Sequence, residues 1–188
     1  MLKKIKIDLD TDFFVNQDYS NSGFSCISYQ QREQKDLYDE YGDTSNYTED
    51  NTHLKQLWYE DGDIDYKELG EKLGMEVITV SSILQPPGNV ITLHRDTFFK
   101  IKQKYPDDKR LLVRANIYLE DWKVGHVIQY KQQLPKDVVE TSENEWVTSD
   151  NWKAGEGFIW STAIPHLSGN MGVKPKYTLQ VSGFLVGS

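Results

Sequence analysis

VITLHRDTFF, residues 90–99, is the stretch on which the predicted fold and chemistry of this chain depend. It reads as a β-strand in which His94 and Asp96 stand two residues apart. Because side chains at positions i and i+2 of a strand point to the same face, the imidazole and the carboxylate converge while Arg95 points away. Two histidines and one carboxylate on one face are the ligands that hold non-haem Fe(II) and leave coordination positions open. The stretch therefore supplies two of the three ligands of such a site.

The candidates for a third ligand are few. The chain contains four histidines, His53, His94, His126 and His166. His166 follows the apolar run GFIW (157–160) and a turn of small residues. The segment KYTLQVSG, which begins at Lys176, alternates with period 2 and places Lys176, Thr178 and Gln180 on one face of a strand. A cation and a hydroxyl on a shared face predict a receptor for a carboxylate.

Together these residues resemble the metal and co-substrate set of the Fe(II)/2-oxoglutarate-dependent oxygenases, whose pattern is HxD, a distant His, and Arg or Lys shortly after it. The resemblance covers residues 78–186. Within that superfamily the chain is most similar to the aspartyl/asparaginyl β-hydroxylase-like group, which includes free-proline hydroxylases. The segments that carry this finer similarity are PPGNVITLH (86–94), LLVRANIYLED (111–121) and WKAGEGFIW (152–160).

The chain also departs from the pattern of that group. Asn116 stands two residues after Arg114, where the group usually has His. The connection from Asp96 to Arg114 is longer than usual, with FFKIKQKYPDDKR (98–110) inserted. Asp96 is present, whereas the best-known animal aspartyl hydroxylase lacks the triad carboxylate. The resemblance therefore implies a complete iron site without carrying over the substrate of that enzyme.

The resemblance implies a role for each residue of the set. His94, Asp96 and His166 would be the catalytic iron ligands, and Lys176 with Thr178 would bind the distal carboxylate of 2-oxoglutarate. Lys174 competes with Lys176 but is disfavoured because it precedes Pro175 and lies closer to His166. Ser82, beside Ser81, lies where the group has a serine that contacts 2-oxoglutarate, with its register left open by an extra residue before Pro87.

RLLVRANIYLE (110–120) predicts a further wall of the pocket. One parity of this segment is wholly apolar, and the other carries Arg114, Asn116, Tyr118 and Glu120. A surface strand would turn that polar parity toward water. Beside a metal-binding strand it instead predicts an inner wall, with Arg114 and Asn116 as candidates for binding a co-substrate carboxylate. His126 shares the parity of apolar neighbours, which predicts a buried or substrate-facing imidazole more than an iron ligand.

The activity implied by the resemblance is that of a dioxygenase using Fe(II), with 2-oxoglutarate and O2 as co-substrates. It would hydroxylate a C–H bond of an amino-acid residue in a peptide or protein, or of a free amino acid, and release succinate and CO2. Two alternatives stay open: a non-enzymatic jelly-roll module that binds a metabolite or sugar, and a metal cupin that does not use 2-oxoglutarate. The triad together with the cation favours the oxygenase, because a sugar-binding module needs neither.

The composition of the chain limits its expected binding partners and cellular location. The net charge of −8 and pI near 5.0 argue against nucleic-acid binding, which depends mainly on Lys and Arg. Cys26 is the single cysteine, which excludes an internal disulfide and is typical of a reducing cytosol, so we expect a cytoplasmic protein. The N-terminal segment MLKKIKIDLDTDFF (1–14) reads as an alternating strand rather than a signal peptide, and no apolar run is long enough to cross a bilayer.

We expect residues 1–188 to form a single domain. The predicted secondary structure changes at Met75 from helices and loops to strands. Residues 1–75 predict a cover of mixed helix and loop, with a strand in 1–15 and helices near 34–41, 52–60 and 65–74, the last closed by Gly74. Residues 76–188 predict the catalytic core, whose strands lie near 75–84, 89–96, 110–120, 124–130, 136–141, 157–161 and 176–187. Many short strands at close spacing predict a mainly β fold with flanking helices, namely a cupin-like double-stranded β-helix or jelly roll.

Overall fold

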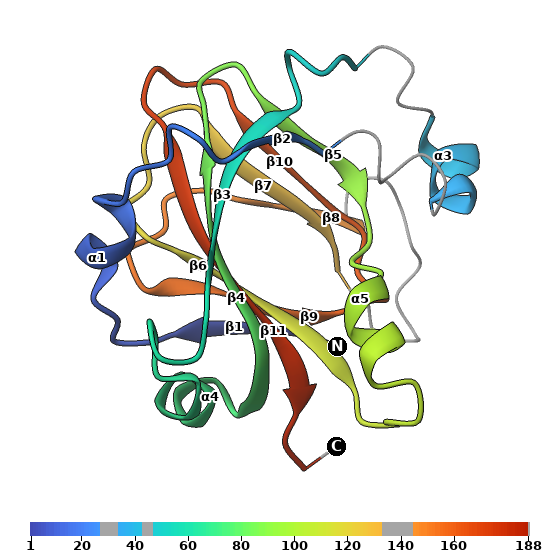
Figure 1. Ribbon diagram of the computed structural model, residues 1–188. Helices are drawn as coiled ribbons and strands as arrows, with labels where there is room; N and C mark the ends of the chain where they lie inside the picture. The colour runs from blue at the N-terminus through green and yellow to red at the C-terminus, as the bar shows by residue number, and fades with distance from the viewer. Residues whose placement is uncertain (27–33, 43–46, 133–144, 188) are drawn as a thin grey trace.

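Two antiparallel β-sheets enclose a shared interior (Figure 1). This computed structural model describes residues 1–26, 34–42, 47–132 and 145–187. The larger sheet has the strand order β1 (Leu2–Lys6), β9 (Glu156–Ser161), β6 (Leu112–Tyr118), β11 (Lys176–Leu185), β4 (Met75–Gln85), β3 (His53–Tyr59) and β2 (Gly23–Ser25). The smaller sheet has the order β5 (Val90–His94), β10 (His166–Asn170), β7 (His126–Lys131) and β8 (Trp146–Ser149). The helices are α1 (Thr11–Val15), α3 (Lys35–Tyr41), α4 (Tyr66–Leu73) and α5 (Phe99–Lys104).

Strand β11 lies within the larger sheet, and its alternation decides what each face of that sheet does. It is antiparallel to β4 along one edge and to β6 along the other. Leu179 and Val181 are completely buried on the outer face, in a core to which helix α4 contributes Leu69. Thr178 and Gln180 point the opposite way and line a pocket between the two sheets. The apolar half of the strand therefore stabilises the fold, and the polar half faces the interior.

Helix α4 covers the outer face and shows how local sequence fixes an element. Asp65 caps its start by accepting a hydrogen bond from the backbone N–H of Glu68 at 2.9 Å, and Gly74 ends it in the left-handed conformation with φ 69°. An N-cap side chain typically contributes about 1 kcal/mol, and glycine adopts a left-handed conformation without steric cost. The predicted helix closed by Gly74 is thus confirmed. Within the described residues, no helix is long and apolar enough to cross a membrane.

The N-terminal segment contributes more to the sheets than its sequence predicts. The prediction of a helix over 52–60 is wrong, because this segment forms β3 and pairs with β2 and β4. Leu54 and Leu57 are three residues apart and fit a helix, but pairing along both edges of the strand satisfies its backbone and prevails. Strands β1 to β3 all belong to the larger sheet, so residues 1–75 do not act only as a cover. The helix predicted near 34–41 is confirmed as α3.

Most strands predicted after Met75 are present. The segments 75–84, 89–96, 110–120, 124–130, 157–161 and 176–187 correspond to β4, β5, β6, β7, β9 and β11. The strand predicted at 136–141 lies outside the described residues. Strands β8 and β10 and helix α5 are additions to the predicted set, and α5 lies in the inserted segment 98–110. The predicted fold class, a mainly β jelly roll with flanking helices, is confirmed, whereas the single-domain boundaries stay a prediction.

Candidate metal centre and adjoining pocket

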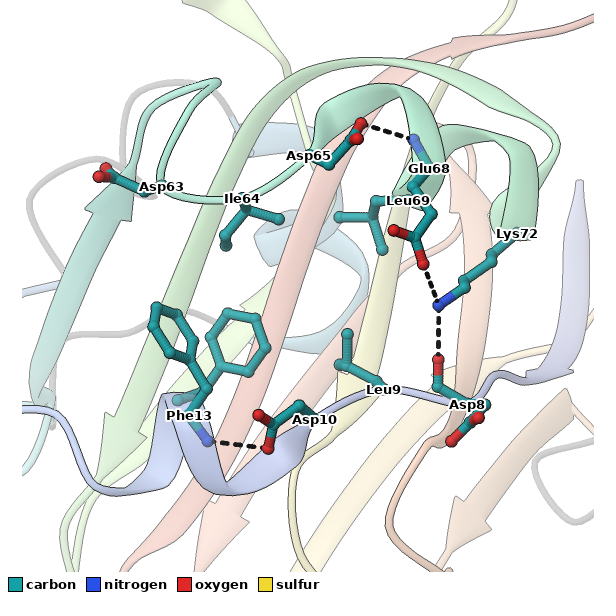
Figure 2. Close-up of a pocket in the computed structure, with 11 residues that line it drawn as sticks. Asp8, Leu9, Asp10, Phe13, Asp63, Ile64, Asp65, Glu68, Leu69 and Lys72 are labelled. Carbon is teal, nitrogen blue, oxygen red and sulfur yellow. Dashed lines mark hydrogen bonds and ion pairs between the residues drawn. The ribbon is translucent and has the colours of Figure 1, made fainter.

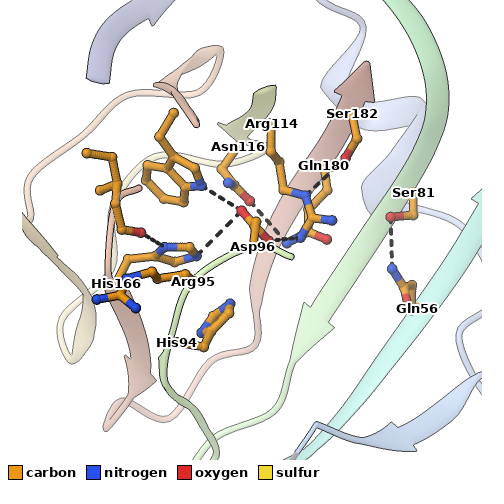
Figure 3. Close-up of polar contacts among 12 residues, drawn as sticks. Gln56, Ser81, His94, Arg95, Asp96, Arg114, Asn116, His166, Gln180 and Ser182 are labelled. Carbon is orange, nitrogen blue, oxygen red and sulfur yellow. Dashed lines mark hydrogen bonds and ion pairs between the residues drawn. The ribbon is translucent and has the colours of Figure 1, made fainter. Parts of the chain in front are cut away.

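His94, Asp96 and His166 converge where β5 ends and β10 begins (Figure 3). His94 and His166 are direct partners in the antiparallel pairing, and their ring centroids lie 4.2 Å apart. Asp96 lies two residues beyond the end of β5, so the predicted HxD strand stops at its histidine and the connection to α5 brings the carboxylate toward the rings. One potential ligand atom of each residue lies within 4.8 Å of the others. The three side chains are therefore close enough to share one metal ion.

Hydrogen bonds to backbone carbonyls orient both imidazoles. Nδ1 of His94 lies 2.8 Å from the carbonyl oxygen of Thr92, and Nδ1 of His166 lies 2.9 Å from that of Ile164. Because a carbonyl only accepts, each Nδ1 carries a proton and donates it, which leaves the lone pair of each Nε2 for a metal. Burial lowers the pKa of His94, and burial together with the neighbouring His94 lowers the pKa of His166 to about 3. Both rings are therefore neutral at physiological pH, as metal binding requires.

Two donors from the larger sheet hold the carboxylate of Asp96. Arg114 on β6 forms an ion pair with Oδ1, and Trp160 on β9 donates its Nε1–H to Oδ2 at 2.8 Å. Oδ2 also lies 3.8 Å from Nε2 of His166, so it is the oxygen that faces the histidine. Burial raises the pKa of Asp96, but the charge of Arg114 leads the opposing contributions, and the net pKa lies below its ordinary value. The carboxylate is therefore ionised, the form that binds a metal.

The donor set fits a first-row divalent metal such as Fe(II). Two imidazole nitrogens and one carboxylate oxygen on one side leave the opposite side open for other ligands.

Arg114 is itself held in place by neighbouring side chains. Its Nε donates to Oγ of Ser182 at 3.0 Å, and its guanidinium lies 5.3 Å from the ring centroid of Phe98. These contacts position the carboxylate of Asp96.

A pocket extends from the triad into the space between the sheets. Its lining residues are Ile83, Gln85, Ile91, His94, Asn116, Ile128, Trp160, His166, Leu167, Ser168, Thr178 and Gln180. The larger sheet supplies amide and hydroxyl groups together with Ile83 and Trp160, and the smaller sheet supplies three aliphatic side chains together with the two histidines and Ser168. Polar groups therefore stand among apolar ones, an arrangement that can orient a small polar ligand.

Lys176 lies buried behind Ser168, one of the lining residues. Its Nζ donates to Oγ of Ser168 and to the carbonyl oxygen of Val127 at 3.0 Å, and Ser168 in turn donates to Oε1 of Gln85 at 2.8 Å. No carboxylate pairs with this ammonium among the described residues. Burial lowers the pKa of Lys176 to about 7. A buried cation held only by neutral acceptors is a suitable partner for the carboxylate of a ligand.

Asn116 leaves a polar atom unsatisfied inside the pocket. Its Oδ1 accepts a hydrogen bond from Nε2 of Gln180 at 3.1 Å, but its buried Nδ2 has no partner. Most buried polar groups in native proteins are hydrogen-bonded, and an unpaired one that lines a pocket can be satisfied by a bound molecule. Asn116 therefore offers a donor to an oxygen atom bound in the pocket.

The structure brings most of the predicted site residues together but separates Ser82 from them. Ser82 lies on the outer face of β4, where its Oγ accepts from the hydroxyl of Tyr19 at 2.6 Å and lies 2.7 Å from that of Tyr59. The pocket position predicted for Ser82 is therefore wrong, and Ser81 is the serine that shares the inner face with the pocket-lining Ile83. The cause is the register that the sequence left open.

Two other histidines lie away from the triad contacts. Nε2 of His126 lies 3.0 Å from the carbonyl oxygen of Lys174, so that imidazole is buried against the connection between β10 and β11. His53, at the start of β3, is exposed. Neither residue belongs to the cluster of potential metal ligands found among the described residues.

Sequence reasoning missed Trp160 and Ser168 as parts of the site. The sequence suggests only a core or rim aromatic at Trp160, whereas its indole N–H contacts Asp96. The one available signal is its position in a segment shared with the resembling group. Ser168 is detectable, because it stands two residues after His166 and a strand there places both side chains on one face.

The strand orders define a double-stranded β-helix, and the two histidines with Asp96 define a candidate metal centre inside it. No protein-family model matches the sequence. No curated protein matches it either.

Solved structures resemble this fold at low sequence identity. A Pseudomonas putida prolyl-4-hydroxylase is 17% identical with a TM-score of 0.53, and the match covers 98% of this chain and 92% of that one. The non-heme alpha ketoglutarate dependent carbocyclase SnoK from nogalamycin biosynthesis is 11% identical with a TM-score of 0.55, covering 97% and 79%. The epimerase SnoN of the same biosynthesis is 14% identical with a TM-score of 0.49, covering 70% of this chain and 62% of its own length. The first two similarities support the jelly-roll fold.

A separate groove lies on the outer face of the larger sheet, between α1 and α4 (Figure 2). Several of its acidic side chains have local structural roles. Asp10 accepts from the backbone N–H of Phe13 at 3.3 Å, and Glu68 pairs with Lys72 at 2.8 Å. Helix capping and surface ion pairs account for these carboxylates, so we assign no ligand to the groove.

Proposed function

We propose that this protein is an Fe(II)- and 2-oxoglutarate-dependent dioxygenase that hydroxylates a C–H bond of an amino acid, either within a peptide or protein or as the free molecule. One observation carries the proposal: a neutral pair of histidines with an ionised Asp96 shares the interior of a jelly roll with Lys176, a buried cation that lacks a carboxylate partner among the described residues. The names of two structures with this fold, a prolyl-4-hydroxylase and an alpha ketoglutarate dependent carbocyclase, agree with it.

In this proposal His94, Asp96 and His166 hold Fe(II), with Nε2 of each ring and Oδ2 of the carboxylate as ligand atoms. The iron would supply oxidative chemistry that couples decarboxylation of 2-oxoglutarate, yielding succinate and CO2, to insertion of an oxygen atom from O2 into a C–H bond. Trp160 keeps Oδ2 turned toward the histidines through its N–H. The neutral rings and the ionised carboxylate allow the site to bind the metal without first losing protons.

Lys176 is the proposed partner of the distal carboxylate of 2-oxoglutarate. The ligand would accept hydrogen bonds from Nζ in place of Ser168, and the hydroxyl of Thr178 on the same face of β11 would add another. We reassign Asn116, whose Nδ2 has no partner, from the co-substrate to the substrate. We reassign Arg114 from binding co-substrate to positioning Asp96, because its described contacts are with that carboxylate, Ser182 and Phe98.

The two alternative functions account less well for Lys176. A module that binds a sugar gains nothing from a buried ammonium without a counter-charge, since burying a charge is costly. A metal cupin without 2-oxoglutarate leaves the same cation without a role. We further propose a cytoplasmic location, because the single cysteine, Cys26, is free and buried, and we expect no nucleic-acid partner for a chain with a net charge of −8.

The test begins with anaerobic protein, Fe(II) and 2-oxoglutarate. A weak visible charge-transfer band should appear as 2-oxoglutarate is added, and admission of air should yield succinate. Asp96→Ala should abolish both signals, whereas Lys174→Met, which alters a neighbouring lysine, should preserve them. A folded, metal-loaded protein that shows neither the band nor succinate would contradict the proposal.

A further inference from the structure

We propose that four side chains, Trp58, Ser81, Gln180 and Asn116, form a cross-strand row on which the substrate lies, and that the substrate is an internal residue of an extended peptide rather than a free amino acid. This inference rests on the proposed function and narrows its substrate class. We call these four residues the polar row. They come from four neighbouring strands, β3, β4, β11 and β6.

The pairing register aligns the polar row. Trp58 is opposite Ser81, Ser81 is opposite Gln180, and Gln180 is opposite Asn116. Residues directly opposite each other in antiparallel strands point to the same face of a sheet, so all four side chains lie on the inner face. Figure 3 shows Asn116 and Gln180 near Asp96, with Ser81 and Gln56 farther from the triad. The row therefore leads from the candidate metal centre toward the β3 side of the sheet.

The length of the polar row exceeds that of an amino acid. Neighbouring strands lie about 4.8 Å apart, so the three steps from Asn116 to Trp58 cover about 14 Å. An extended peptide advances about 3.3 Å per residue, so about four residues would span the row. A free amino acid at the metal centre would occupy only its inner end.

Asn116 points to what the inner end of the row binds. This side chain is 4% exposed, lines the pocket beside the triad and has an Nδ2 without a partner. It can donate only to an acceptor that a ligand brings. Farther along, Ser81 is 2% exposed and accepts a hydrogen bond from Nε2 of Gln56 at 2.9 Å, so it positions Gln56 on the same face. The free donor of Asn116 suits a carbonyl oxygen of a peptide backbone.

The polar row carries no charge. Its members present two carboxamides, a hydroxyl and an indole, and a peptide group is likewise uncharged with one donor and one acceptor. The α-ammonium of a free amino acid would need an anion, and the only described carboxylate beside the pocket, Asp96, already pairs with Arg114. Its α-carboxylate would compete with the co-substrate for Lys176. Charge complementarity therefore favours a substrate whose termini are both in peptide bonds.

Trp58 marks the outer end of the row. Its side chain is 59% exposed even though it belongs to the inner face of the sheet. A single exposed apolar residue is ordinary on a protein surface, so exposure alone carries no weight. Trp58 differs from such a residue because the pairing register aligns it with the unpaired donor of Asn116. Its indole can therefore pack against a side chain of a peptide that lies along the row.

The experiment compares two matched sets of probes with the iron-loaded protein, 2-oxoglutarate and air. One set contains the twenty free amino acids, and the other contains peptides of five residues, blocked at both ends, with each amino acid in turn at the centre of an alanine background. At least one peptide should gain 16 Da and raise succinate formation, and the free amino acids should not. Hydroxylation of a free amino acid, or succinate formation that no peptide raises, would overturn the inference while leaving the proposed function intact.

Variants distinguish a role of the polar row in substrate binding from general effects of substitution on the fold. Trp58→Ala should raise the KM for the hydroxylated peptide about tenfold. Gln180→Glu, which keeps the shape and adds a charge, should raise that KM as well. Phe13→Ala removes an exposed aromatic from α1, on the outer face, and should leave the KM unchanged. Equal effects of Trp58→Ala and Phe13→Ala would overturn the inference. Failure of the protein to bind 2-oxoglutarate in the absence of any probe would instead reject the proposed function.

Discussion

Arg114 and Asp96 form an ion pair that joins the two sheets at the candidate metal centre. Arg114 comes from β6 in the larger sheet, and Asp96 follows β5 in the smaller one. The single negative charge of the triad is therefore balanced by the protein itself. The arrangement explains how a carboxylate that is only 4% exposed stays ionised among buried groups.

Replacing Arg114 should destabilise the metal-free protein. Arg114→Met leaves Asp96 buried without its counter-charge, a change that typically costs about 3 kcal/mol or more at buried pairs. We expect a loss of about 2 to 4 kcal/mol in the free energy of unfolding, since the guanidinium keeps some exposure, and a smaller loss with saturating Zn(II) as a redox-inert metal. Urea unfolding without metal and with saturating Zn(II) measures the two losses in the free energy of unfolding. Arg110→Met, which removes exposed ion pairs, is the control, and equal losses in the two variants would contradict the account.

Replacing Trp160 should weaken metal binding without emptying the core. Trp160→Phe keeps an aromatic ring next to His166, whose centroid lies 4.2 Å from that of Trp160, but removes the N–H that binds Oδ2 of Asp96. Loss of a hydrogen bond to a ligand typically reduces metal affinity about 10- to 100-fold. Competition with a chelator measures the affinity. Trp152→Phe, a buried change without a contact to Asp96, should leave it unaltered.

The pKa of Lys176 predicts proton uptake on co-substrate binding. Burial lowers that pKa to about 7, so at pH 8 the side chain is mostly neutral, and a bound carboxylate would raise the pKa again. Calorimetry at pH 8 in buffers of different ionisation enthalpy should show close to one proton taken up with 2-oxoglutarate. Lys176→Met should abolish the uptake and weaken binding about 10- to 100-fold, in line with a charge-assisted hydrogen bond of about 1.5 to 3 kcal/mol. Binding without proton uptake in the unaltered protein would argue against this role.

The same pKa affects stability in a defined direction. An unfolded chain has Lys176 near its ordinary pKa of 10.5, so between pH 7 and that value it binds more protons than the folded protein does. This group therefore makes the free energy of unfolding rise with pH above 7, whereas below pH 7 both states are protonated and its contribution is constant. Comparing urea unfolding of Lys176→Met with the unaltered protein from pH 6 to 9 isolates the effect.

Ser82 should matter for stability and not for the co-substrate. Its Oγ is buried and bonded to the hydroxyls of Tyr19 and Tyr59, so Ser82→Ala leaves those groups short of a partner. We expect a loss of about 1 to 3 kcal/mol in the free energy of unfolding. The KM for 2-oxoglutarate should stay unchanged. A large rise in that KM with little change in stability would instead support a contact between Ser82 and the co-substrate.

The residues that sequence reasoning placed correctly are those whose position follows from alternation. Lys176, Thr178 and Gln180 share a face because a strand has period 2, and that pattern needs no knowledge of the rest of the fold. The proximity of His94 to His166 required a resemblance, because the two histidines lie far apart in the chain and on different strands.

The residues that were misplaced depend on pairing between strands. Ser81 and Ser82 differ only in which face they occupy, and a shift of one residue exchanges them. The ion pair of Arg114 joins two sheets, so no local pattern encodes it. Residues 52–60 contain apolar positions that fit either a helix or a strand, and the neighbouring strands β2 and β4 decide between them.

Strand β11 gives the proposed pocket a fixed length. Its inward residues run from Lys176, the proposed anchor of a carboxylate, to Ser182, which holds the guanidinium that positions Asp96. Pairing with β4 over this whole stretch, and with β6 from Thr178 onward, keeps these two positions at a constant separation. If the proposed function holds, β11 fixes the length of the co-substrate: a 2-oxo diacid one methylene shorter or longer than 2-oxoglutarate would reach the metal or the lysine, but not both.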